Sequence, residues 1–165
     1  MIDQLHELLE MQRVLDEAIL KEHGNVYDEK IAEQMKIALF VELGELMNEM
    51  PTKFKHWKKT AKDNREAALV EYVDALHFAL SLTNHTVQRG KYDDDYEEYS
   101  DLVHLDYSWI LYSIMHECCS PDANLKMILG HLFILGNKLG FTWDEVYQVY
   151  KAKNQVNYER LANGY

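Results

Sequence analysis

Residues that interrupt helices are scarce in this chain, and so is cysteine. Its 165 residues include 7 Gly, 2 Pro and 2 Cys. So few helix breakers argue against an all-β domain and favour a helical one. Cys118 and Cys119 are adjacent, a spacing that suits neither an ordinary disulfide nor a CxxC metal pair. Two reduced thiols are typical of a cytoplasmic protein.

Positive charge and long apolar runs are also lacking. The chain has 17 Lys and Arg against 28 Asp and Glu, a formal net charge of -11. This balance argues against nucleic acid or an anionic membrane as a partner bound through bulk charge. No window approaches the roughly 18 apolar residues of a membrane span, and the acidic N-terminal segment differs from a signal peptide. Apolar residues make up 47% of the chain, which is enough for a single domain over residues 1–165.

Helical signals dominate the chain and predict an all-α fold, a compact bundle of about six helices. We expect helices over about 2–22, 28–50, 64–89 and 122–139. Another helix should follow the acidic run KYDDDYEE and end near the two cysteines. The last helix should open with a capping box at Thr142 and Glu145 and end at about residue 162.

The apolar stripes of the second and third predicted helices run into acidic residues. At about 100° per residue, the stripe of Ile31, Met35 and Ala38 continues with Glu42, Glu45 and Glu49. The third helix has Glu71 and Asp74 inside the stripe of Ala67, Phe78 and Leu82. Both helices should therefore turn carboxylates inward. A buried carboxylate without a cation costs several kcal/mol, so we expect a cation there.

The spacing of these acids suits a divalent metal. Glu42 and Glu45 are three residues apart, as are Glu71 and Asp74, so each pair projects from one side of its helix. Two facing pairs form a cage of hard oxygen ligands, which suits Mg²⁺ or Mn²⁺. A single ExxE pair is also a common pattern on a solvated surface. Two such pairs on consecutive helices favour the metal site.

Basic and amide residues near the acids suit phosphate and sugar. The segment TKFKHWKKTAK (52–62) holds Lys55 and Lys58, which suit a polyphosphate, and Trp57, which suits a base. The alternative is an exposed, solvated turn. On the last helix, Lys153, Asn157 and Arg160 continue an apolar stripe, with Asn154 at its edge. That face is a candidate phosphate and sugar site, and the alternative is a solvated helix end.

The first helix carries Gln12 in the middle of its apolar stripe, with Asp16 near the edge. A buried glutamine must satisfy both a carbonyl and an amide group. The edge of a pyrimidine base offers the matching donor and acceptor. A structural hydrogen bond within the protein is the other interpretation.

Taken together, the motifs resemble those of the dimeric, all-α dUTPases, which belong to the MazG-like nucleotide pyrophosphohydrolases. They are MQxxLD (11–16), ELGELMNE (42–49), FKHWK (54–58), EYVDALHF (71–78) and YKAKNQVNYER…GY (150–165). ExxE…ExxD alone identifies the superfamily, whereas EYVDALHF with KNxxNxxR…GY is more specific. Residues 85–140 carry no matching signature.

This resemblance implies a homodimer that hydrolyses dUTP, and commonly dUDP, to dUMP with Mg²⁺, for which Mn²⁺ substitutes. It assigns the metal to Glu42, Glu45, Glu71 and Asp74. It assigns base and deoxyribose to Gln12, Trp57, His77 and Phe78, and sugar and phosphates to Lys153, Asn154, Asn157 and Arg160. Asp16 of the base pocket stands where many relatives have Asn, and Leu161-Ala162 follows Arg160 where a Gln-containing stretch is expected. Both departures bear on base discrimination more than on hydrolysis.

The expected chemistry is attack by a water whose pKa the metal lowers. Glu42 is the first candidate for the base and Glu49 the second. Lys153 and Arg160 would stabilise charge on the terminal phosphate, assisted by Lys55 and Lys58.

Two other functions fit the same residues. One is an all-α pyrophosphohydrolase acting on dCTP or a damaged nucleotide. The other is a non-catalytic helical interaction protein that keeps ExxE…ExxD as a structural cation site. The basic face of the last helix argues against the second, because a metal site alone does not require it.

Overall fold

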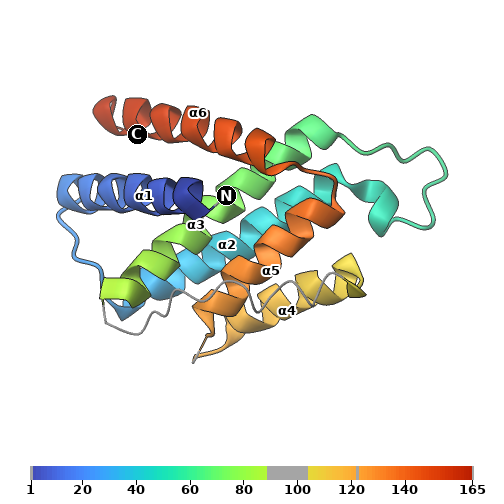
Figure 1. The fold of residues 1–165 in the computed structure, drawn as a ribbon, viewed down its shortest axis with the longest axis horizontal. Coiled ribbons are helices and arrows are strands. Elements are labelled where there is room, and N and C mark those ends of the chain that lie inside the picture. The colour runs from blue at the N-terminus through green and yellow to red at the C-terminus, as the bar shows by residue number, and fades with distance from the viewer. Residues whose placement is uncertain (1, 89–103, 122, 165) are drawn as a thin grey trace.

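The computed structural model describes residues 2–88, 104–121 and 123–164. Within these ranges it contains α-helices and one 3-10 helix but no strand, so the predicted all-α fold is confirmed (Figure 1). The elements are α1 (Ile2–Glu22), α2 (Glu29–Glu49), η1 (Pro51–Lys53), α3 (Arg65–Gln88), α4 (Tyr107–Cys119), α5 (Leu125–Lys138) and α6 (Trp143–Ala162). The acidic run KYDDDYEE lies outside the described residues.

Side-chain caps decide where several of these helices begin. Asp28 accepts a hydrogen bond from the Ile31 amide at 2.8 Å and begins α2. The predicted capping box of α6 is confirmed, because Thr142 and Glu145 cap each other's backbone amides. α5 begins at Leu125 and not at about residue 122, because the Asn124 side chain accepts from the Met127 amide.

α3 is the central helix of the bundle. It packs against α1, α2, α5 and α6, while α4 packs against α2 and α5. Over residues 65–85, the part of α3 whose side chains are described, more than half of the residues are buried, which is typical of a helix surrounded by others. Tyr72 of α3 donates its hydroxyl hydrogen to the Leu132 carbonyl of α5 at 2.9 Å. Gly136 of α5 makes room for that ring, since a Cβ there would lie 2.7 Å from Tyr72 Cζ.

The core-facing side of α2 differs from the prediction. Its buried apolar residues include Leu39, Leu43 and Leu46, which lie roughly 90° around the helix from the Glu42 face. The expectation that Glu42, Glu45 and Glu49 continue the core stripe of their helix was therefore wrong. Glu42 and Glu49 are half-buried, and Glu45 is exposed. The leucine stripe is larger and more continuous than that of Ile31, Met35 and Ala38, so it gains more from burial.

Among the described residues, no helix combines the length and the apolar character that a membrane span requires.

Candidate active site

A cavity of about 330 Å³ lies between four helices, α1, α2, α3 and α6. Its lining includes nine of the predicted site residues, which are Gln12, Asp16, Glu42, Asp74, His77, Phe78, Lys153, Asn157 and Arg160. Leu15, Ile19 and Met35 add apolar walls. The fold thus brings together residues from both ends of the sequence around one space.

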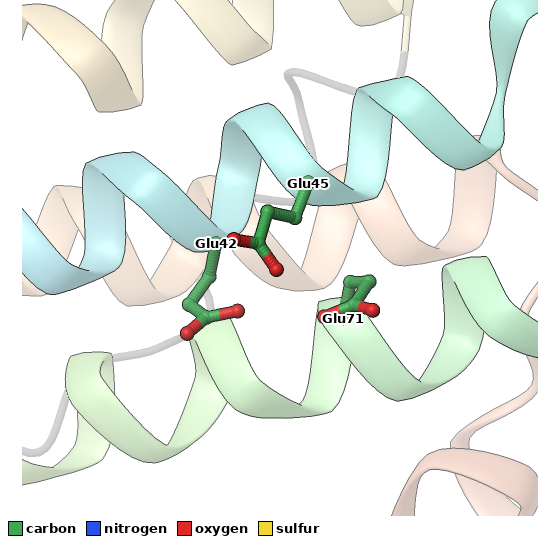
Figure 2. Close-up of side chains that lie close together, drawn as sticks. All are labelled: Glu42, Glu45 and Glu71. Atoms are coloured by element: carbon green, nitrogen blue, oxygen red, sulfur yellow. The ribbon is translucent and has the colours of Figure 1, made fainter.

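Three carboxylates gather where α2 faces α3. Each of Glu42, Glu45 and Glu71 offers an oxygen, and these oxygens lie within 4.8 Å of one another. Figure 2 shows Glu42 and Glu45 pointing from α2 toward α3, where Glu71 lies. Asp74, one turn after Glu71, instead receives a hydrogen bond from Lys153 Nζ at 2.6 Å.

This concentration of negative charge shifts the pKa values of the acids. Burial, followed by the charges of Asp74, Glu45 and Glu71, raises the pKa of Glu42 to about 7, and Lys153 partly opposes the rise. Burial and the charges of Asp74 and Glu45 also raise the pKa of Glu71. A bound cation would reduce the repulsion between these clustered carboxylates. Their hard oxygen atoms are ligands that suit Mg²⁺ or Mn²⁺.

A second group of polar side chains is buried at the other side of the cavity. Gln12 is only 4% exposed, and its Nε2 donates to Asp16 Oδ1 at 2.7 Å. Its Oε1 lies 2.6 Å from the Tyr150 hydroxyl, which donates to it, and 2.7 Å from His77 Nδ1. The His77 and Tyr150 rings stack with their centroids 3.9 Å apart. Helices α1, α3 and α6 are therefore joined by one hydrogen-bonded network.

Ionisation within this network departs from ordinary values. Burial, followed by the charge of Lys153, lowers the pKa of His77 to about 3, so its ring is neutral. Burial raises the pKa of Asp16 to about 6, and the nearby Ser81 hydroxyl and the hydrogen bond from Gln12 limit the rise. His77 Nε2 is buried and has no hydrogen-bond partner among the described residues. His77 is itself one of the residues that line the cavity.

Comparison with known protein families identifies the family of this chain. A family model described as dUTPase matches residues 4–165 of the chain. The chain belongs to the dUTPase family. The resemblance and the enzyme class expected from the sequence, a dUTP diphosphatase, are thereby confirmed, and the non-catalytic alternative is set aside. A search of curated proteins found no match.

Four predicted substrate residues of this dUTPase lie outside the cavity lining. Asn154 is buried on the inner side of α6. Lys55, Trp57 and Lys58 lie on the segment between η1 and α3, which Figure 1 shows at the opposite end from the C-terminal part of α6. Trp57 is 66% exposed and meets Phe54 and His56 edge to face.

Two features of the dUTPase site were not predicted from its sequence. Tyr150 is not among the predicted site residues, although a buried tyrosine usually needs a partner for its hydroxyl. The Lys153–Asp74 ion pair joins residues 79 positions apart. No local sequence pattern identifies such a pair. Taken alone, Asp74 suits a metal ligand and Lys153 suits a phosphate contact.

Proposed function

We propose that this dUTPase acts in the cytoplasm on dUTP and dUDP, forming dUMP, with Mg²⁺ held by Glu42, Glu45, Glu71 and Asp74. The observation that carries the proposal is the group of carboxylate oxygens within 4.8 Å on facing helices. Mn²⁺ prefers similar oxygen ligands and should substitute. When bound, the metal would neutralise phosphate charge and lower the pKa of a water.

Glu42 is the proposed general base. Conversion of dUTP to dUMP and diphosphate requires water to attack one of the two phosphorus atoms that share the α–β bridging oxygen, while the bond from that phosphorus to the bridging oxygen breaks. The water loses a proton in this step. Glu42 lines the cavity, and its pKa of about 7 suits a group that accepts a proton near neutral pH. Glu49 is half-buried and close enough to Glu71 to raise the pKa of that residue, and it is the second candidate.

The α6 side of the cavity suits the polyphosphate. Lys153, Asn157 and Arg160 project from successive turns of α6 into the lining. Lys153 is held beside the acids by Asp74. Cations positioned this way stabilise the negative charge that develops on the phosphates as the α–β bond breaks. We propose that Asn154 supports this face from its buried position.

The α1 and α3 side suits the nucleoside. Gln12 has one amide hydrogen beyond its bond to Asp16, which can donate to a uracil oxygen. Phe78 is half-buried in the lining and suits contact with the base. His77 Nε2 can accept from the deoxyribose 3′-hydroxyl.

We also propose a homodimer. Outside the core, α2 presents Ile37, Phe40, Val41 and Gly44 at helical spacing, and the three large side chains are exposed. A second copy would cover them. Lys55, Trp57 and Lys58 lie outside the cavity of their own protomer, so their substrate role requires a second copy or movement of their segment. If Ile37→Glu leaves the mass measured by analytical ultracentrifugation unchanged, this surface is not the interface.

The substrate and metal are tested together by initial rates with dUTP, dUDP, dCTP and dTTP. We expect turnover of dUTP and dUDP, dependent on Mg²⁺ and stopped by EDTA, with dUTP at least about tenfold better than dCTP in kcat/KM. Equal rates with dUTP and dCTP would favour the broader pyrophosphohydrolase. Turnover that persists in EDTA would contradict the metal role.

A paired set of variants separates the metal site from general acidity. Glu45→Gln should weaken Mn²⁺ binding, measured by electron paramagnetic resonance, and abolish turnover. Glu66→Gln is the matched control, since Glu66 is an exposed acid in the first turn of α3. Equal loss in both variants would mean that bulk charge, and not this cluster, attracts the metal.

A further inference from the structure

We propose that Asp16 is a positioning residue for His77, acting through Gln12 to make His77 Nε2 a hydrogen-bond acceptor at the wall of the cavity. Asp16 and His77 are not bonded directly. The connection runs from α1 to α3 through the two ends of one amide. Only the identity of the group that Nε2 meets rests on the proposed function.

The first step is the orientation of the Gln12 amide. A carboxylate has oxygen acceptors and no donor, so the partner of Asp16 Oδ1 at 2.7 Å must be the amide nitrogen. The two ends of a glutamine amide have nearly the same shape, and packing alone distinguishes them poorly. Asp16 therefore determines that Gln12 Oε1 points toward Tyr150 and His77.

The second step is the position of the His77 hydrogen. A carbonyl oxygen only accepts, so His77 Nδ1, 2.7 Å from Gln12 Oε1, must carry the hydrogen. A neutral imidazole has one such hydrogen, and Nε2 is then an acceptor. Tyr150 does not determine this polarity, because a hydroxyl can donate or accept in either arrangement.

The third step concerns the cavity. His77 is 5% exposed, and its ring is held by stacking on Tyr150 at an angle of 15°. Its Nε2 has no hydrogen-bond partner among the described residues. A buried acceptor at the wall of a cavity selects a ligand that brings a hydroxyl or N–H donor, and the opposite tautomer would select an acceptor. The Asp16–Gln12 pair thus determines the kind of group accepted at this position.

The test is the tautomer of His77, read from the nitrogen chemical shifts of protein labelled with ¹⁵N-histidine. The wild type should show hydrogen on Nδ1. Asp16→Ala frees the Gln12 amide to turn, and a population with hydrogen on Nε2 should appear. Tyr150→Phe should keep the Nδ1 hydrogen, since the amide orientation is retained. Glu17→Ala is the matched control, because Glu17 is exposed on the next position of α1 and should change nothing.

An unchanged tautomer in Asp16→Ala, or a changed one in Tyr150→Phe, would overturn the inference. If Asp16→Ala does not fold, Asp16→Asn serves instead. Its side chain has the same size and offers both a donor and an acceptor to Gln12, so a mixture of tautomers is expected and a pure Nδ1 form overturns the proposal.

A kinetic readout identifies the group that meets Nε2. The kcat/KM of the wild type for dUTP should exceed that for its 3′-deoxy analogue by about tenfold, and Asp16→Ala should reduce this ratio toward one. A shifted tautomer with an unchanged ratio would support the control by Asp16 and overturn the proposed contact with the 3′-hydroxyl. The tautomer measurement therefore tests the role of Asp16, and the kinetic ratio tests the contact with the 3′-hydroxyl, so either proposal can be refuted without the other.

Discussion

Asp16 should make the protein less stable as the pH rises through its own titration. Burial raises the pKa of this carboxyl from 3.8 to about 6 in the folded protein. A raised folded pKa contributes stability that is fully present below pH 3.8 and is lost as the pH rises through about 6. Two pKa units correspond to about 3 kcal/mol, of which about 2 kcal/mol falls between roughly pH 7.5 and pH 4.5.

Asp16→Asn removes this titration without changing the size of the side chain. The measurement is urea unfolding of both proteins in EDTA, at one protein concentration and at roughly pH 7.5 and pH 4.5. Relative to the wild type, the variant should lose about 2 kcal/mol of unfolding free energy on going to the lower pH.

Both the wild type and Asp16→Asn must be measured, because another buried group, His77, changes the unfolding free energy with pH in the opposite direction. The pKa of His77 is lowered from 6.5 to about 3, so its contribution to stability is lost as the pH falls below 6.5. In the wild type, the opposite effects of Asp16 and His77 on the pH dependence of the unfolding free energy partly cancel. Groups that are common to both proteins and lie outside the hydrogen-bonded network of Asp16, Gln12 and His77 cancel in the difference between them. A difference that does not vary with pH would refute the argument and mean that Asp16 titrates as an exposed acid.

Three further predictions concern separate parts of the molecule. Asp74→Asn should abolish dUTP turnover while the circular dichroism of the helices persists, and a near-normal kcat would remove Asp74 from the metal role. Arg160→Ala should lower kcat/KM for dUTP by about tenfold or more and leave the dUTP-to-dCTP ratio unchanged, because Arg160 lies on the α6 side of the cavity. A changed ratio in steady-state rates would place it near the base. Gly136→Ala should cost about 1–3 kcal/mol and lower the thermal midpoint, because the new Cβ would lie 2.7 Å from the buried Tyr72 ring. An unchanged thermal midpoint would show that the Tyr72 ring can move aside without loss of stability.

Much of the local structure could be predicted because its causes are local. The helix order follows from periodicity and from few breakers, and the capping box at Thr142 and Glu145 is a signal within four residues. The inward position of Gln12 follows from the stripe of α1, and its burial agrees with that prediction. Family membership follows from short motifs, most of which are stretches of helix.

The sequence by itself determined which residues form helices and which polar groups interrupt their apolar faces. Only the tertiary structure decided which of the two α2 faces enters the core, because both are locally apolar and packing against α3 and α4 selects the larger. It also decided that Lys153 meets Asp74 across 79 positions and that Tyr150 meets Gln12 across 138. These partners come from helices whose relative placement depends on non-local packing, and a pattern with a period of 3.6 residues contains no information about it.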